Sequence, residues 1–297
     1  MSKIVGIVGT VPDPAFPLIH GKASLADGRL RIGGREVSVD RGTPALLAAA
    51  IRAAECLEGV DVYAFLVGDI GRGGGSRALY QFLEQHLAEF DLSVLAFHYL
   101  QPDVDWHNRV LFAVDAMPRR PVLIADAGFM YAAKMSGQAA CYDLFTPDRG
   151  ELAFLADELA PHPFYTRGFI LHQDQAVPDL IRRAYAHQNG AAYLLVKGRT
   201  DYLADEKQVI ATVASPAHNA MEAIGGTGDT LTGLLAALCG AGYSRTDAAV
   251  AAALANRLTG RYANPSPATQ VAELIDKIPQ ALSKALNGYR KEASHVG

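Results

Sequence analysis

The chain has 297 residues, of which half are hydrophobic and a fifth are charged, and its formal net charge is −4 at pH 7. This composition is typical of a globular protein with enough apolar residues to build a sizeable core. Clusters of basic residues are short, such as Arg119-Arg120, so neither nucleic acid nor an anionic membrane surface is indicated as a partner. An anionic ligand therefore has to be held by a local site.

The cysteines and the first apolar segment indicate the compartment. Cys56, Cys141 and Cys239 are widely spaced and form no CxxC pair, which predicts buried free thiols in a reducing environment. The first apolar run, Ile4–Val8, is too short for a signal peptide, and no stretch of the chain is long enough to span a membrane. We therefore expect a cytoplasmic protein.

Short apolar runs alternate with longer helical patterns along most of the chain. The predicted strands, in chain order, are Ile4–Val8, Val62–Val67, Val94–His98, Val122–Ala125, Leu144–Thr146 and Tyr193–Lys197. The predicted helices are Pro44–Leu57, Ser76–Phe90, Trp106–Met117, Pro178–Asn189 and a helix that includes Thr230–Leu238. This alternation predicts an α/β fold with a doubly wound, mostly parallel sheet flanked by helices and joined by right-handed crossovers.

Two segments depart from the alternation. Gly33-Gly34 separates two short alternating runs, which predicts a β-hairpin over residues 29–39, a candidate flap at one edge of the sheet. A second hairpin is predicted over Tyr202–Val213. Residues 265–297 have the pattern of a terminal helix and tail. Because no repeat or linker interrupts the chain, we expect one domain over residues 1–297.

The segment Gly226-Thr227-Gly228-Asp229 directly precedes a clear helix. Glycines let the backbone approach an anion closely, and the start of a helix adds partial positive charge, so this turn is predicted to bind a nucleotide phosphate. It is neither a dinucleotide fingerprint nor a Walker A loop. Asp229 either caps the helix or acts as the base that takes a proton from a hydroxyl attacking a phosphoryl group. The chemical role explains better why a carboxylate stands beside a bound anion.

Three further segments end predicted strands. Asp126 follows Val122–Ala125, where open α/β sheets bind ligands. Asp148 and Glu151 follow Leu144–Thr146 and either organise water around Mg²⁺ or form a capping box at the start of a helix. Lys197-Gly198 ends the strand after them, a position suited to a nucleotide phosphate. Because all these strands end in the same sense, we expect the segments to converge with the glycine turn on one crevice.

These segments, in order, resemble the ribokinase-like superfamily and, within it, the ADP/ATP-dependent NAD(P)H-hydrate dehydratases, the carbohydrate-kinase-like family of YjeF C-terminal type. Gly42-Thr43-Pro44 is similar to the Gly-Ala-Pro that opens the family's Ala-rich helix, and Ile124-Ala125-Asp126-Ala127 to its Asp-Ala-Asp-Ala segment. Thr146-Pro147-Asp148-Arg149-Gly150-Glu151 is similar to Thr-Pro-His-Pro-Gly-Glu, and the glycine turn completes the set. The resemblance covers about residues 40–260.

The resemblance implies an enzyme that transfers a phosphoryl group from ATP or ADP to the hydroxyl of hydrated NAD(P)H and then eliminates it. It implies that Lys197, Gly198, Thr200 and Gly228 contact the nucleotide and that Asp229 faces the substrate hydroxyl. Asp126, Asp148 and His98 are then expected on the substrate side, with Mg²⁺ held through water by Asp148 and Glu151. Oligomers are common in the superfamily, so a homo-oligomer is compatible with it.

The residues expected beside the substrate hydroxyl, which accepts the phosphoryl group, depart from the family pattern. The family's Gly-Pro-Gly-Leu-Gly is replaced by His98-Tyr99-Leu100-Gln101-Pro102, and its histidine is Asp148 here. A glycine-rich stretch occurs earlier, over residues 68–77, as a second phosphate-binding loop or a mobile connection. Two alternatives to the dehydratase therefore stay open: a kinase of another small hydroxyl compound, and a non-catalytic relative that binds a nucleotide.

Overall fold

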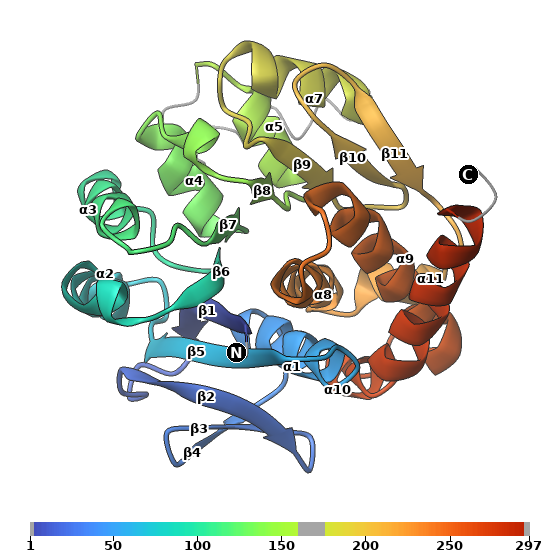
Figure 1. Cartoon of the computed structure of the whole chain (residues 1–297), viewed down its shortest axis with the longest axis horizontal. Coiled ribbons are helices and arrows are strands. Elements are labelled where there is room, and N and C mark those ends of the chain that lie inside the picture. Colours follow the sequence, from blue (N-terminus) through green and yellow to red (C-terminus); the bar gives the residue numbers. More distant parts are fainter. Residues whose placement is uncertain (1–2, 160–175, 294–297) are drawn as a thin grey trace. The chain divides into compact units, whose positions relative to one another are not determined.

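The computed structural model describes residues 3–159 and 176–293, with side chains described up to residue 287. The chain divides into two compact units. Unit 1 comprises Met1–Ile7, Ile19–Phe65 and Val213–Gly297, and unit 2 comprises Val8–Leu18 and Leu66–Thr212. Two of the boundaries between the units, at Ile7/Val8 and Phe65/Leu66, fall within the strands β1 (Lys3–Val11) and β5 (Val60–Gly68), which Figure 1 labels. The single domain expected over residues 1–297 stays a prediction.

Unit 2 contains the parallel part of the sheet. Its strands are β6 (Leu92–Phe97), β7 (Val122–Ala125), β8 (Leu144–Phe145) and β9 (Tyr193–Val196), which pair in parallel in this order, followed by β10 (Asp201–Ala204) and β11 (Val209–Val213). β10 is antiparallel to β9. The register aligns Phe97 with Ala125 and Ala125 with Phe145, so β6, β7 and β8 end level. The residues after these strands consequently lie along one edge.

The crossover segments of unit 2 are helical. They are α2 (Gly74–His86), α3 (Val104–Asp115), α4 (Gly128–Met135), α5 (Arg149–Ala156) and α7 (Val177–Ala186), with 3₁₀ turns η1 (Leu87–Glu89) and η2 (Ala139–Cys141). The strands they cover are apolar at successive positions, as in Leu123-Ile124-Ala125, and all three of these residues are fully buried. Capping side chains start two of the helices, since Asp103 accepts a hydrogen bond from the N–H of Trp106 and Asp148 accepts one from the N–H of Glu151.

Unit 1 contains the antiparallel N-terminal strands of the sheet and the C-terminal helices. β2 (Ile19–Ala26), β3 (Arg29–Ile32) and β4 (Arg35–Ser38) follow β5 in the sheet order, and β3 is antiparallel to both its neighbours. The helices are α1 (Thr43–Ala54), α8 (Thr227–Ala241), α9 (Arg245–Ala263), α10 (Val271–Ile275) and α11 (Ile278–Ala293), with a 3₁₀ turn, η4 (Asn219–Ala223). Helices α1 and α8 pack closely, since a Cβ at Gly233 would lie 2.2 Å from the carbonyl oxygen of Leu46.

The predicted fold class is confirmed: the sheet is mixed and mostly parallel, helices flank it, and the N-terminal strands are antiparallel. The hairpin over residues 29–39 is confirmed, with Gly33 and Gly34 at φ 55° and 79° in its turn. The strands β10 and β11 confirm the second hairpin. The terminal helix lies within the described residues, whereas the last residues of the predicted tail, 294–297, lie outside them.

Two expectations about exposure can be compared with the structure. The three cysteines are free, but the prediction that all are buried is wrong for Cys56, which is exposed just beyond the end of α1, and Cys141 is half-buried. Among the described residues, no helix combines the length and the apolar character needed to cross a membrane.

Candidate functional site

In unit 2, two strand ends place His98 and Asp126 side by side. His98 directly follows β6 and Asp126 directly follows β7, and the N–H of Asp126 donates to the carbonyl oxygen of Phe97 at 3.0 Å. Both side chains are buried, with exposed fractions of 0% and 1%. The His98 Nε2 lies 3.9 Å from the Asp126 Oδ2. A buried imidazole and a buried carboxylate therefore face each other at the carboxyl ends of parallel strands, where ligands bind in open α/β sheets.

The residue after each of these side chains has a strained backbone. Tyr99 has φ 31° and Ala127 has φ 50°, a region of the Ramachandran map that favours glycine. The next residue, Gly128, has no room for a side chain, since a Cβ there would lie 2.8 Å from the carbonyl oxygen of Leu100. Strain of this kind costs about 1–3 kcal/mol and is concentrated at functional sites. The loops after β6 and β7 are thus held in one tight arrangement.

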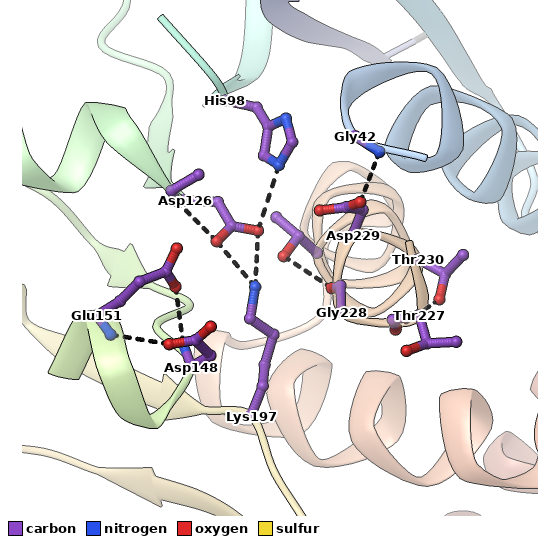
Figure 2. A network of polar contacts seen from close by, with 12 residues as sticks. Gly42, His98, Asp126, Asp148, Glu151, Lys197, Thr227, Gly228, Asp229 and Thr230 are labelled. Carbon is purple, nitrogen blue, oxygen red and sulfur yellow. Dashed lines mark hydrogen bonds and ion pairs between the residues drawn. The ribbon is translucent and has the colours of Figure 1, made fainter. Parts of the chain in front are cut away.

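Lys197, at the end of β9, pairs with Asp126. Its Nζ lies 2.8 Å from Oδ1 and 2.9 Å from Oδ2 of Asp126 (Figure 2). The Lys197 side chain is 12% exposed. The N–H of Ala127 also donates to Oδ1 of Asp126, at 2.8 Å. Because both charges are largely removed from water, each depends on the other, and losing either would leave an uncompensated buried charge.

Asp148 and Glu151 form the capping box at the start of α5. The Asp148 Oδ1 accepts a hydrogen bond from the N–H of Glu151, and the Glu151 Oε2 accepts one from the N–H of Asp148, both at 2.8 Å (Figure 2). Burial, and then the neighbouring carboxylate of Asp148, raise the pKa of Glu151, whereas Lys197 acts in the opposite direction. The Lys197–Asp126 pair and the capping box therefore belong to one electrostatic group in unit 2.

In unit 1, the candidate phosphate-binding turn begins α8. Gly226 precedes the helix at φ 99°, in the left-handed conformation, and no side chain caps the helix start. Asp229 lies in the first turn, and its Oδ2 accepts a hydrogen bond of 2.7 Å from the N–H of Gly42, the residue that precedes α1 (Figure 2). The carboxylate is thus oriented by a backbone amide beside a helix start that no side chain caps. This arrangement combines a candidate anion-binding turn with a candidate base.

Asn256 on α9 supports this turn and was missed by the sequence reasoning. Its Nδ2 donates to the carbonyl oxygen of Thr227 at 3.0 Å, and its Oδ1 accepts from the hydroxyl of Thr230 at 2.7 Å. Asn256 is buried, so these hydrogen bonds fix the first turn of α8 from a neighbouring helix. The signal in the sequence was a polar residue within an Ala-rich helix.

In the glycine-rich loop over residues 68–77, the backbone N–H groups are hydrogen-bonded to the carboxylate of Asp69, which belongs to the same loop. The Asp69 Oδ1 accepts hydrogen bonds from the N–H groups of Gly71, Arg72 and Gly73, and Oδ2 accepts from the N–H and the hydroxyl of Ser76. Burial acts to raise the pKa of Asp69, but these hydrogen bonds lower it below its ordinary value. The N–H groups that a phosphate would need are thus directed at Asp69.

The predicted site residues fall into two groups. Unit 2 brings His98, Asp126 and Lys197 into contact, and the charges of Asp126 and Lys197 act on Glu151, which forms the capping box with Asp148. Gly198 and Thr200 lie in the turn between β9 and β10, where the N–H of Gly198 donates to Asp201 Oδ1 at 3.0 Å. Unit 1 carries the turn formed by Gly226, Thr227 and Gly228 together with Asp229. The ligands assigned to these residues stay predictions.

Comparison with known proteins identifies one family model and two sequence relatives. A family model described as NAD(P)H-hydrate dehydratase matches residues 102–280, more than half of the chain. A protein of Methanocaldococcus jannaschii, MJ1337, described only as uncharacterized, is 40% identical over 242 residues, which cover 81% of this chain and 100% of the relative. The bifunctional NAD(P)H-hydrate repair enzyme Nnr of Hyperthermus butylicus is 33% identical over 109 residues, 36% of this chain and 20% of that enzyme.

Solved structures show the same fold at low sequence identity. A ribokinase-like superfamily protein from Enterococcus faecalis is 17% identical, with a TM-score of 0.55 over 95% of this chain and 87% of that one. Pyridoxal kinase from Bacillus subtilis, solved as an ADP complex, is 16% identical, with a TM-score of 0.52 over 85% of this chain and 89% of that one. The family model matches more than half of the chain, so this chain belongs to the NAD(P)H-hydrate dehydratase family, and its fold is that of a solved ribokinase-like superfamily protein.

Proposed function

We propose that this protein uses ATP or ADP to dehydrate hydrated NAD(P)H. The terminal phosphoryl group is transferred to the hydroxyl of the hydrated ring. The bond between the ring carbon and the phosphate oxygen then breaks, phosphate leaves, and the neighbouring carbon loses a proton to form the ring double bond. The products are NAD(P)H, inorganic phosphate and the nucleotide shortened by one phosphate. Membership of the family supports this reaction. The observation that carries it is the Asp229 carboxylate, held by the Gly42 amide in the first turn of α8.

Asp229 is the proposed base. The hydrogen bond from Gly42 fixes the orientation of the carboxylate, so that it is ready to take the proton of the attacking hydroxyl without reorganisation. The backbone amides of Gly226-Thr227-Gly228-Asp229 would stabilise the charge on the phosphoryl group in transfer, because the start of α8 has no side-chain cap. A carboxylate beside a bound anion is unfavourable in a protein that only binds a nucleotide, which argues against a non-catalytic role.

The remaining residues divide between nucleotide and substrate. Lys197, Gly198 and Thr200 are proposed to contact the nucleotide. His98, Asp126 and Asp148 are proposed to face the substrate. Asp148 and Glu151 are oxygen donors of the type that Mg²⁺ prefers, and each uses one carboxylate oxygen in the capping box. Mg²⁺, when bound, would neutralise charge on the phosphates.

A kinase of another small hydroxyl compound is the second candidate. The observation that favours it is the loop after β6, where His98-Tyr99 stands in place of the glycine-rich stretch with which the family is identified. Such a kinase would use Asp229 in the same way, because both reactions begin with phosphoryl transfer to a hydroxyl. The two functions differ only in the second step, since the dehydratase eliminates the phosphate and the kinase releases a phosphorylated product.

Recovery of reduced-nicotinamide absorbance tests the proposal. The protein is incubated with hydrated NADPH, Mg²⁺ and either ATP or ADP, and we expect absorbance to return in proportion to nucleotide consumed. Asp229→Asn should abolish this turnover and leave nucleotide binding intact, since the amide keeps the shape of the side chain but is no base. Ser38→Ala, on the exposed face of β4, is the matched control. Stimulation of ATP turnover by another alcohol, with no recovery of NADPH, would refute dehydration in favour of a kinase.

A cytoplasmic location and assembly into a homo-oligomer are also proposed. The three free thiols support the first, because thiols stay reduced in the cytoplasm.

A further inference from the structure

Tyr99 is an exposed aromatic residue whose two neighbours in the chain are buried. Its side chain is 51% exposed, whereas its neighbours His98 and Leu100 are 0% and 1% exposed. Its backbone lies at φ 31°, an outlier for a bulky residue. Exposing a large ring and straining the backbone both cost free energy, and the fold accepts both costs at one position beside His98 and Asp126.

The loop that carries Tyr99 is pinned on each side. The hydroxyl of Thr10 donates to the carbonyl oxygen of Tyr99 at 2.7 Å. The N–H of Gln101 donates to the Ser76 hydroxyl oxygen at 3.0 Å, and the hydroxyl of Tyr80 donates to the carbonyl oxygen of Gln101 at 3.0 Å. The N–H of His98, on the other side, donates to the carbonyl oxygen of Val8 at 2.8 Å. These backbone hydrogen bonds hold the loop in one arrangement, so the exposure of Tyr99 is a property of an ordered loop.

The ring of Tyr99 also has an ordered environment. Its centroid lies 4.1 Å from that of the His98 ring, in an edge-to-face arrangement. His98 in turn faces Asp126. The aromatic surface is thus continuous with the residues proposed for the substrate, and a planar ring laid on Tyr99 would be held next to them.

We propose that Tyr99 is a stacking platform for a planar nitrogen heterocycle of the hydroxyl-bearing substrate. This inference rests on the proposed function, whose substrate carries a planar adenine ring in addition to its puckered, hydrated nicotinamide ring. Stacking on an aromatic side chain tolerates different bases because each presents a π face. The platform selects substrates that contain a heterocycle over small polyols, and it accounts for a tyrosine at a position where the backbone favours glycine.

Three substitutions at Tyr99 separate stacking from stability. Tyr99→Leu removes the π face and should raise KM for hydrated NADPH at least about fivefold, with KM for ATP unchanged. Tyr99→Phe keeps the face and should stay within about twofold of the wild-type KM. Tyr99→Gly also relieves the strained φ, so its Tm should be maintained while its KM rises as in the leucine variant. Phe112→Leu, at an α3 side chain that is 72% exposed, is the control and should change nothing.

Titration of NADPH by calorimetry tests the platform without turnover. Wild-type protein should bind NADPH at least about fivefold more tightly than Tyr99→Leu. Equal affinities, a KM for hydrated NADPH within twofold of wild type in the leucine variant, or a rise in KM for ATP alone would overturn the inference. Absence of NADPH recovery by the wild-type protein instead refutes the proposed function, and the calorimetric comparison still decides whether Tyr99 binds the heterocycle.

Discussion

The Asp69 carboxylate closes the glycine-rich loop of unit 2 from inside, and replacing it should destabilise the fold strongly. It accepts four backbone N–H groups and one hydroxyl at distances between 2.8 and 3.1 Å. Hydrogen bonds to a charged group contribute about 1.5–3 kcal/mol each and are not additive. We therefore expect Asp69→Ala to lower the free energy of unfolding by about 3–5 kcal/mol. Asp69→Asn should cost about 2–4 kcal/mol, because the NH₂ group of the asparagine side chain would point at one of these N–H or O–H groups and could not accept its hydrogen bond.

Urea unfolding at several pH values measures this effect. The pKa of Asp69 is lowered in the folded protein, so its contribution to stability is present above the unfolded pKa of about 3.9 and is lost as pH falls through the folded value. The difference between wild type and Asp69→Asn should therefore be constant above about pH 5 and shrink below about pH 4. Asp91→Asn, at an exposed ion pair with Arg119, is the control. A loss below about 1 kcal/mol in Asp69→Ala would show that other groups hold the loop.

Three further predictions concern a buried ion pair, a tight contact between two helices and a raised pKa. Lys197→Met should destabilise by about 3–5 kcal/mol in urea unfolding, because it leaves the Asp126 carboxylate buried without its cation; adding Asp126→Asn should cost less than the sum of the single losses. Gly233→Ala should cost about 1–3 kcal/mol, since its Cβ would meet the Leu46 carbonyl, whereas Gly74→Ala, with open space around its Cβ, should be neutral or stabilising. Because the pKa of Glu151 is raised, its ionisation should reduce stability as pH rises above about 4.3, and Glu151→Gln should flatten this decline; an unchanged slope would contradict the raised pKa.

Much of the fold was predictable because the strands of unit 2 are covered on both faces. Continuous apolar runs such as Val122–Ala125 have few alternatives to buried parallel strands, and that strand was predicted with its observed bounds. The strand β2 (Ile19–Ala26) was not predicted, since its side chains alternate weakly between buried and exposed and several prolines precede it. The short helix α4 was also missed, because Gly128 and Lys134 interrupt its apolar pattern.

The site was predictable where a residue directly follows a strand. Asp126 and His98 lie at level strand ends, and the parallel register makes them neighbours whatever the loops do. The pairing of Lys197 with Asp126 could not be predicted, because it depends on the direction of a long side chain that crosses the end of the intervening strand β8. The role of Asn256 could not be predicted either, since its side chain donates a hydrogen bond to a backbone carbonyl oxygen of another helix.

Two glycine-rich turns within the described residues, one before α2 and one before α8, each begin a helix, and the position of their aspartate differs. Asp69 precedes its glycines, so the chain folds back and the amides of Gly71 and Gly73 point at its carboxylate, which excludes a phosphate. Asp229 follows its glycines, so it lies within the helix and cannot occupy the turn that precedes it; its carboxylate is instead held by Gly42. An aspartate before the turn thus caps its own loop, whereas an aspartate after the turn lies where the proposed base would stand beside the proposed anion site.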